Sequence, residues 1–336
     1  MISSRSVVIS LHTLHHSVFD DNMRYCDKTF LDLRKIGMNT LQNLRAFLAV
    51  VETGSFSAAA RRSGLATSVL TKRVDQLEHA VRTKLFTRTT RTVTLTEAGQ
   101  RWIERVRFLL SDIDDAMRQV SAAAQELEGP VRIKAPTTLT ALYIGDVLTR
   151  FQTVNPKVSI ELVLTDRVVN PADEGFDLAI AAFNATFSGV VDVPLCPLRR
   201  QLCAAPEYLA RRGAPRHPRE LLEHETISFA PTGPIWSFSG PGGPSTVELA
   251  PIFSANDGQV LLKAARAGNG IALLSEYLIL PSLKAGELVT VLEDHSPPEI
   301  WVKILIPEAR MKVARVHALS EFVKDAFSPS PPWARP

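Results

Sequence analysis

Residues 47–99 read FLAVVETGSFSAAARRSGLATSVLTKRVDQLEHAVRTKLFTRTTRTVTLTEAG, and this stretch decides the fold of the first part of the chain. Apolar residues recur at steps of three and four before Gly54, as on one face of a helix. Gly54 and Ser55 are residue types that end one helix and begin the next, and Gly64 makes a second turn. The stretch therefore predicts three short helices joined by tight turns.

The third of these helices has two different sides. Its inner side is apolar, with Val69, Leu70, Val74 and Leu77. Short hydroxyl side chains reach base edges or phosphates, and long cations pair with phosphate or guanine. The outer side carries both types: Thr67, Ser68, Thr71, Lys72 and Arg73. We interpret it as a surface that reads DNA, although the same residues would also suit a solvated polar face.

A basic hairpin is predicted directly after the third helix. Residues 87–95 are rich in threonine and valine, which favours two short strands, and Arg88 and Arg91 lie near their turn. The basic tip of such a hairpin is often simply exposed to solvent and binds nothing. Beside a helix-turn-helix it can act as a wing that sets arginines against phosphates or in the minor groove.

The charge distribution supports a polyanion partner for this region alone. Residues 38–100 contain nine basic and four acidic residues, a net charge of +5, whereas the whole chain carries +3. The remaining residues therefore sum to −2. A basic head on a slightly acidic body favours nucleic acid as the partner of the head.

At this point the chain resembles the LysR-type transcriptional regulators. The segments FLAVVETGSFSAAARRSG, LTKRVDQLE and KLFTRTTRTVTLTEAG look like the DNA-binding domain of that family. Two positions depart from the family pattern. Ala66 stands where Ser or Thr usually opens the recognition helix, so we expect Thr67 to take over the cap. Arg82 replaces a usual glycine, so it either adopts a left-handed conformation or the turn differs.

The resemblance continues into the second part of the chain. The segments EGFDLAIAAF, CAAPEYLARRGAPRHPRELLEHETISF and NDGQVLLKAARAGNGIALL are similar to the family's regulatory domain. The implied fold is multidomain: an all-α winged helix-turn-helix head on a long coiled-coil linker helix, then a two-lobed α/β domain like the type 2 periplasmic binding proteins. From the residues themselves we expect a largely parallel sheet with covered faces.

A long helix with one apolar stripe is predicted between the two parts. Apolar residues alternate at three and four positions, typical of a coiled-coil seam, although packing against the chain's own body is the alternative. The predicted seam is Trp102, Val106, Leu109, Leu110, Ile113, Ala116, Met117, Val120, Ala123, Ala124 and Leu127. The resemblance implies a homodimer or tetramer, and paired heads would read an inverted-repeat operator.

These patterns predict the following division of the chain. The segments are an extension at 1–37, poorly ordered or absent from the native protein; the winged head at 38–95; the linker helix at 96–128; lobe I at 130–198 and 298–328; lobe II at 199–297; and a disordered tail at 329–336. We expect Met38 to be the natural start.

In the implied architecture a small effector binds between the lobes, against strand ends and helix N-termini. The candidates for that site are Thr137, Thr138, Asp166, Phe183, Ser228, Asn256 and Asp257. Thr137 and Asn256 would alternatively cap helices, and Phe183 would belong to a core. Threonines beside an aromatic ring point to a small organic acid or an aromatic effector.

Other classes of protein are less compatible with the sequence. It contains no catalytic motif and no metal-ligand spacing, so we expect neither an enzyme, nor a metal site, nor a cofactor. Three widely spaced cysteines indicate a reducing compartment such as the cytoplasm, and Cys196 and Cys203 most simply fill apolar strand positions. The resemblance implies the bacterial cytoplasm, with the protein at the nucleoid. RNA polymerase is a further possible partner. The alternatives are a cytoplasmic solute-binding protein or an architectural DNA-binding protein without effector-controlled transcription.

Overall fold

The computed structural model describes residues 40–89, 92–120 and 127–335. The chain divides into two compact units, residues 1–110 and 111–336, and each unit is described by itself. The expected extension at 1–37 lies outside the described residues, as does Arg91. Within the described part, no helix has the length and apolar character needed to cross a bilayer.

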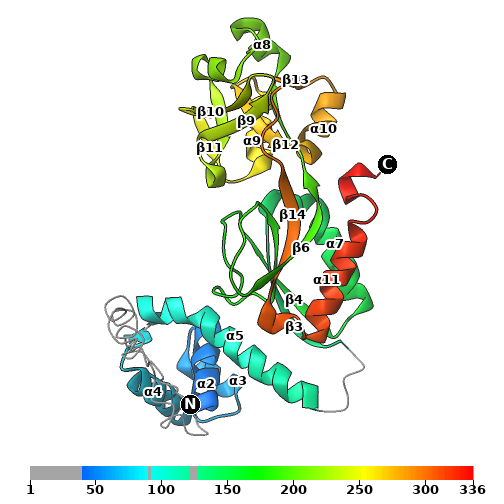
Figure 1. The fold of residues 1–336 in the computed structure, drawn as a ribbon. Helices are drawn as coiled ribbons and strands as arrows, with labels where there is room; N and C mark the ends of the chain where they lie inside the picture. Colours follow the sequence, from blue (N-terminus) through cyan, green and yellow to red (C-terminus); the bar gives the residue numbers. More distant parts are fainter. Residues whose placement is uncertain (1–39, 90–91, 121–126, 336) are drawn as a thin grey trace, which may run out of the picture. The chain divides into compact units, whose positions relative to one another are not determined.

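The first unit, called the head, is a helix-turn-helix with a two-stranded wing (Figure 1). Its elements are α2 (Thr40–Thr53), α3 (Phe56–Arg62), α4 (Thr67–Val81), β1 (Phe86–Arg88), β2 (Val93–Leu95) and the first part of α5 (Glu97–Val120). The strands β1 and β2 pair antiparallel, as the threonine-rich pattern predicts. Ser55 caps α3 by accepting a hydrogen bond from the N–H of Ala58, and Thr96 caps α5 through the N–H of Gly99.

The head core explains where the first half of α5 packs. Phe47 of α2 lies 5.4 Å from Phe86 of the wing and 5.9 Å from Trp102 of α5, measured between ring centroids. Val106 and Leu110 are buried in the same cluster. These α5 residues were expected in a coiled-coil seam, but they cover the core of their own head. The seam expectation is wrong for them, because the wing and α2 present an apolar surface that is nearer.

The two departures from the family pattern have different outcomes. Ala66 is the N-cap of α4, and no side chain caps the helix, so the expected transfer of the cap to Thr67 is wrong. The Thr67 carbonyl instead accepts a hydrogen bond from the Thr71 hydroxyl. Arg82 adopts the left-handed conformation at φ 53°, where its N–H contacts the last carbonyls of α4. It keeps the turn that a glycine would make more easily.

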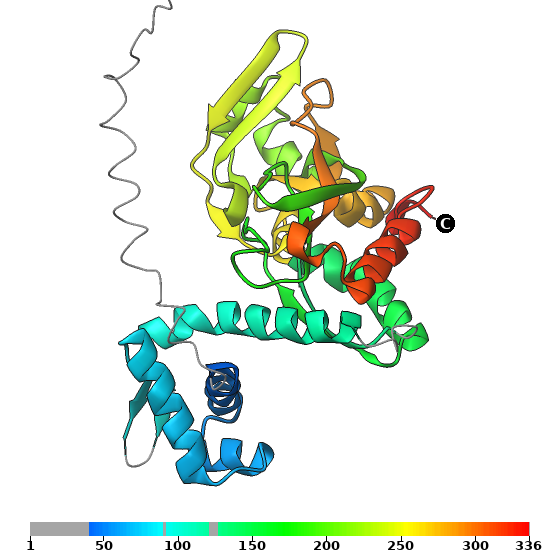
Figure 2. The same cartoon turned by 60° about the horizontal axis from the view of Figure 1, so that its bottom comes forward.

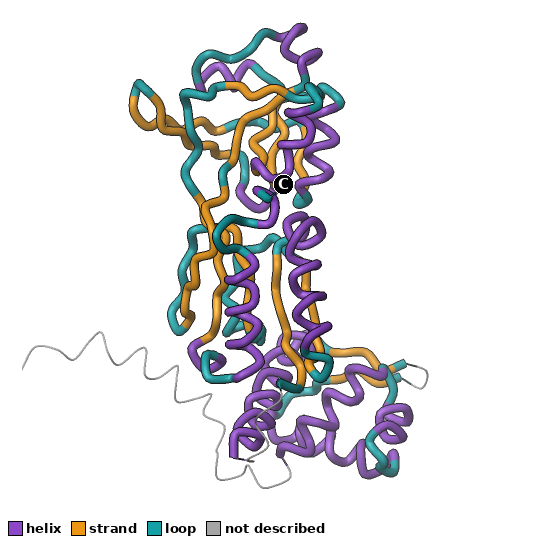
Figure 3. The backbone as a smooth tube through the Cα atoms, turned by 90° about the vertical axis from the view of Figure 1, so that its right-hand side faces the viewer, coloured by secondary structure: helices purple, strands orange, loops and turns teal. Residues whose placement is uncertain are grey.

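The second unit contains two five-stranded sheets, which define lobe I and lobe II (Figures 1 and 3). The lobe I sheet runs in the order β4 (Val158–Leu164), β3 (Gly129–Ala135), β5 (Leu178–Ala182), β14 (Ile300–Pro307), β6 (Val190–Leu198). The lobe II sheet runs in the order β11 (Phe253–Ala255), β8 (Thr226–Phe229), β12 (Ile271–Ser275), β7 (Arg200–Ala204), β13 (Val289–Val291).

Each sheet is largely parallel, as expected, with one strand that runs against the other four. The pairs around β3 and β8 are parallel, whereas β14 and β7 pair antiparallel with both of their neighbours. The reason is the route of the chain. It enters lobe II through β7 and returns to lobe I through β14, and each of these two entering strands runs against the other four strands of its sheet (Figure 1).

Helices flank both sheets. Lobe I has α6 (Thr137–Leu139), the π-helix η2 (Thr140–Ile144), α7 (Gly145–Val154), the 3-10 turn η5 (Glu308–Arg310) and α11 (Ala314–Ala326). Lobe II has α8 (Pro206–Arg212), η3 (Pro218–Glu223), η4 (Ala230–Thr232), α9 (Gly258–Arg266) and α10 (Glu276–Lys284). The separate hairpin of β9 (Ile235–Gly240) and β10 (Gly243–Glu248) extends from lobe II as a long antiparallel ribbon (Figure 2).

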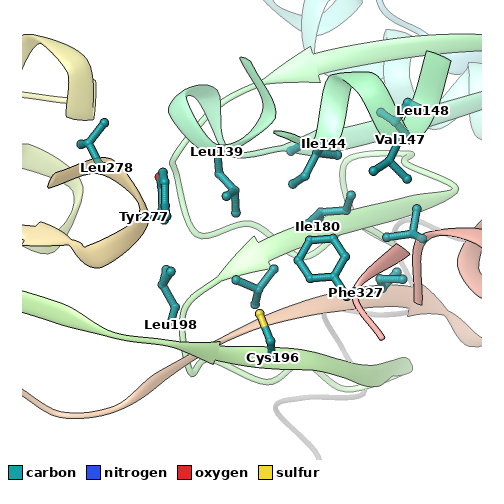
Figure 4. Close-up of a cluster of buried hydrophobic side chains, with 14 of the residues drawn as sticks. Leu139, Ile144, Val147, Leu148, Ile180, Cys196, Leu198, Tyr277, Leu278 and Phe327 are labelled. Atoms are coloured by element: carbon teal, nitrogen blue, oxygen red, sulfur yellow. The ribbon is translucent and has the colours of Figure 1, made fainter. Parts of the chain in front are cut away.

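One hydrophobic cluster runs through both lobes. It includes Leu139 and Ile180 of lobe I, Tyr277 and Leu278 of lobe II, and Cys196 on the crossing strand β6 (Figure 4). Buried side chains of both lobes therefore share one core, with Tyr277 among its members.

The C-terminal tail is ordered, so the expectation of disorder at 329–336 is wrong for its described residues. Pro332–Ala334 forms a 3-10 turn, η6. Trp333 packs against Tyr277, Tyr143 and Phe327 with ring centroids 5.4–5.7 Å apart. The Arg335 guanidinium donates to three carbonyls of the preceding turn. The prolines here restrict the chain, and the aromatic contacts supply the burial that a disordered tail lacks.

Candidate functional site

The exposed face of α4 has the chemistry of a DNA-reading surface. Thr67, Ser68 and Lys72 are exposed, and the helix N-terminus keeps its backbone N–H groups free of a side-chain cap. Free N–H groups at a helix start favour an anion such as phosphate. Val69 was expected on the inner side, but it is 42% exposed and lies on this face too. An exposed valine there can contact a thymine methyl group.

Two of the arginines expected to contact DNA are engaged inside the head. The Arg73 guanidinium donates to the Gln42 side chain at 2.7 Å. Arg88 forms ion pairs with Asp75 at 2.8 Å and Glu78 at 3.4 Å, and its guanidinium lies 4.5 Å from the centroid of the Phe56 ring. Arg88 therefore joins the wing to α4 and α3, and its first role is to position the wing.

Glu78, which the sequence reading counted only as an acid, is central to this arrangement. It is 3% exposed, and one carboxylate oxygen accepts hydrogen bonds from the N–H groups of Leu85 and Phe86. The other oxygen pairs with Lys84 at 2.8 Å. Burial alone would raise the pKa of Glu78. The Lys84 ammonium, the two N–H groups and Arg88 outweigh burial, and the pKa lies below its ordinary value.

In the second unit, a cavity of about 130 Å³ is lined by residues of both lobes. Lobe I contributes residues at the ends of β3 and β5, and lobe II contributes β7, β12 and the start of α10. Cavities of this kind at strand ends between lobes are usual ligand sites. The polar lining residues are Lys134, Thr138, Asp166, Arg200, Thr232 and Ser275.

Three of the seven expected effector residues line this cavity: Thr138, Asp166 and Phe183. The Thr138 hydroxyl donates to Asp257 at 3.0 Å and accepts from the N–H of Gly258 at 2.9 Å. This pair of hydrogen bonds joins lobe I to the N-terminus of α9 in lobe II. Asp257 therefore acts behind the cavity wall, where it also caps α9.

The other expected residues lie away from the cavity. Thr137 supports it indirectly, because its N–H donates to the Asp166 carboxylate at 3.3 Å. The Ser228 hydroxyl is buried and donates to the carbonyl of Gly233, so it holds a loop of lobe II. Asn256 is exposed and does not line the cavity. Neither residue lines the cavity.

Several cavity residues were missed by the sequence reading. Lys134 and Arg200 supply positive charge, and Phe229, Trp236 and Tyr277 supply aromatic surface. One signal was available for Lys134. It is a cation inside a strand flanked by apolar residues, at the carboxyl end where ligands bind in open α/β sheets. No local sequence pattern identifies Trp236 or Tyr277 as cavity residues, because they lie on separate elements of the fold.

The cysteine thiols are packed as apolar residues. Cys196 on β6 and Cys203 on β7 are both buried. Burial raises the pKa of the Cys196 thiol to about 11 and that of the Cys203 thiol to about 12. The thiolate is the reactive form, so both side chains are poorly suited to redox chemistry in this state.

Comparisons with known proteins cover both units. A family model described as "Bacterial regulatory helix-turn-helix protein, lysR family" matches residues 41–100. A second, described as "LysR substrate binding domain", matches residues 124–328.

Individual proteins agree with these matches. The transcriptional activator TtdR of Escherichia coli UTI89 is 31% identical over 82% of this chain and 90% of its own length. The probable regulator LtrA of Klebsiella pneumoniae is 31% identical over 77% of this chain and 84% of its own length. The full-length structure of the Vibrio cholerae virulence activator AphB superposes with a TM-score of 0.57 at 25% identity, covering 84% of this chain and 98% of that one.

Proposed function

The chain belongs to the LysR family of bacterial transcriptional regulators, and from that premise we propose that α4 reads the operator while the cavity between the lobes holds the effector. The observation that carries the DNA assignment is the exposed face of α4. Thr67, Ser68 and Lys72 lie there around an uncapped helix N-terminus. Within this proposal Thr71 and Arg73 support the helix, Arg88 positions the wing, and Arg91 stays a predicted phosphate contact.

Replacing Lys72 with alanine tests this assignment. Loss of one phosphate contact should weaken DNA binding several-fold and make the dependence of log K on log salt shallower by about 1. The operator fragment is first selected from genomic DNA by the purified protein, and affinity is then measured by fluorescence anisotropy at several salt concentrations. Lys284→Ala, an exposed lysine at the end of α10, is the matched control. An unchanged salt slope in Lys72→Ala would remove α4 from the proposal.

We further propose that the protein is a homodimer, or a tetramer built from dimers, on an inverted-repeat operator. The support is an apolar ridge on α5, where Leu109, Ile113 and Met117 are 37%, 40% and 72% exposed. These residues follow one another at four-residue steps, so they lie on one side of the helix. An exposed apolar ridge of this kind favours a partner helix.

Replacing Ile113 with glutamate should dissociate the oligomer, because a charge would be buried in the apolar contact. Sedimentation velocity of the full chain should show a species of half the mass or less, with circular dichroism unchanged. The control is Asp114→Glu, which alters the neighbouring residue without placing a charge on the ridge. Sedimentation of Ile113→Glu identical to the wild type would rule out this ridge as the contact.

The effector proposal is supported by the shared lining of the cavity and by the Thr138 hydrogen bonds that join the lobes. A small molecule changes the equilibrium between two arrangements of the lobes only if it binds them with unequal affinity. We also propose that the protein acts in the bacterial cytoplasm at the nucleoid, contacts RNA polymerase and is not an enzyme. The support is that the matching family models describe a regulatory helix-turn-helix and a substrate-binding domain of the same family. The alternatives without effector-controlled transcription gain no support from the relatives.

A further inference from the structure

The cavity contains a buried cation without a hydrogen-bond partner. Lys134 is 2% exposed and stands at the end of β3, where it lines the cavity. Within the described residues, its ammonium has no hydrogen bond and no ion pair, and it lies 5.5 Å from the centroid of the Phe183 ring. A buried charge without a hydrogen-bonded counter-charge is costly, so this lysine is placed at the expense of stability.

A second cation lies on the same cavity wall. Arg200 of β7 donates through one terminal nitrogen to the carbonyl of Pro298 at 3.1 Å, while its buried Nε has no hydrogen-bond partner in the described structure. The opposing carboxylate, Asp166, is held by Thr137 and does not approach Lys134 within ion-pair distance. Two cations against one carboxylate leave the lining net positive.

The size and the remaining lining limit what this charge can bind. A cavity of about 130 Å³ is close to the roughly 150 Å³ of an engineered apolar cavity that binds benzene. Phe183, Phe229, Trp236 and Tyr277 contribute aromatic surface to the lining. A compact ring therefore fits better than a long chain or a nucleotide.

We propose that the effector is a compact aromatic carboxylate, of about the size of benzoate, whose carboxylate pairs with the Lys134 ammonium while its ring contacts the aromatic lining. This inference rests on the proposed effector cavity and names the chemical class that the cavity selects. Arg200, with its free Nε, is the second donor available to the carboxylate. The ion pair would give Lys134 the partner that it lacks.

The test uses isothermal titration of the full chain with sodium benzoate and with benzamide, which has the same ring and no charge. We expect benzoate to bind the wild type at least ten times more tightly than benzamide. Lys134→Met, which keeps the length of the side chain and removes its charge, should lose at least tenfold in benzoate affinity and leave benzamide unchanged. Lys284→Met, at an exposed lysine of lobe II, is the control for loss of a lysine charge away from the cavity.

A stability measurement separates a ligand anchor from a structural lysine. Burial lowers the pKa of Lys134, with Asp166 and Glu174 opposing and Arg167 assisting, so the charged form is penalised in the folded state. That penalty is fully present below the lowered pKa and is relieved as the pH rises from it toward the ordinary pKa of lysine. Ligand-free Lys134→Met should therefore unfold at a higher urea concentration than the wild type. A lysine with a structural role would instead give a lower midpoint.

The outcomes distinguish this inference from the proposed function. If benzamide binds as tightly as benzoate, or if Lys134→Met keeps the benzoate affinity, the carboxylate anchor is wrong. Absence of benzoate binding also overturns it. Thr138→Val, which removes the hydrogen bonds between the lobes, tests the cavity itself. If benzamide binds as tightly as benzoate and Thr138→Val changes its affinity, the carboxylate anchor is rejected and the effector cavity is kept. If Thr138→Val changes the affinity for neither compound, the cavity is rejected as well.

Discussion

Replacing Asp115 with alanine should lower the free energy of unfolding of the second unit by about 3–5 kcal/mol, the usual cost of removing one partner from a buried ion pair. Asp115 lies in the last turns of α5 and is 4% exposed. Its two carboxylate oxygens pair with Arg315 at 2.6 and 2.9 Å, and one of them also pairs with Arg310 at 2.9 Å. One carboxylate thus compensates two buried guanidinium groups.

The remaining partners cannot replace it. Arg310 is completely buried and also pairs with Asp177 at 3.0 Å, while Arg315 donates to the carbonyl of Pro130 at 2.7 Å. Burial, opposed by Arg310, raises the pKa of Asp177, so that carboxylate already bears a desolvation cost. Without Asp115, the two buried guanidinium groups would keep as carboxylate partners Asp177, with its raised pKa, and the half-exposed Asp112 beside Arg310. The cluster ties the end of α5 to β3, η5 and α11 of lobe I.

Urea denaturation of the full chain, followed by tryptophan fluorescence, measures the effect. The matched control is Asp112→Ala, one turn earlier on α5. Its side chain is half exposed and lies 3.6 Å from Arg310, so its removal should cost less than about 1 kcal/mol. Equal midpoints for Asp115→Ala and Asp112→Ala would show that the cluster does not hold the helix end. A chain that fails to fold only with Asp115→Ala would agree with the prediction.

Local patterns in the sequence account for most of the head, and the reason is the short range of its signals. Ser55, Gly54 and the apolar steps of α2 and α4 act within one or two helical turns, so a periodic pattern identifies them. The partners of Asp115, in contrast, lie 195 and 200 residues further along the chain. No local pattern connects them, and the acid reads as one more solvated charge on a helix.

The cavity was predictable in position and not in composition. The family resemblance and the strand ends pointed to Thr138 and Asp166, which do line it. Lys134 becomes informative only when its burial is known, because an exposed lysine at a strand end is common. The same holds for the seam on α5. The apolar stripe of α5 is present as predicted. Whether residues such as Val106 pack into the head core or against a second chain depends on tertiary packing, which the local sequence pattern does not show.

Replacing Glu78 with alanine is expected to destabilise the head by about 3 kcal/mol, because two buried N–H groups would lose a charged acceptor, and each such bond contributes about 1.5–3 kcal/mol. Those groups belong to Leu85 and Phe86, the residues that start the wing. Because the pKa of Glu78 is lowered in the folded state, its contribution is present at neutral pH and is lost as the pH falls through that value. The free energy of unfolding of Glu78→Ala should therefore be lower than that of the wild type at neutral pH, and it should fall less steeply as the pH is lowered.

DNA binding gives a sharper test of Glu78, because electrostatics and geometry predict opposite signs. Removing a carboxylate makes the basic head one charge more positive, which by counterion release alone would strengthen binding. We expect binding to weaken by about tenfold instead, since phosphate contacts depend on elements held in register and Glu78 holds the wing to α4. Asp75→Ala is the matched control: Asp75 is 48% exposed and also pairs with Arg88, but it accepts no hydrogen bond from the wing backbone. Anisotropy with the selected operator should show unchanged or stronger binding for Asp75→Ala and weaker binding for Glu78→Ala. If both variants bind more strongly, the wing needs no internal anchor, and charge alone governs the affinity of this head.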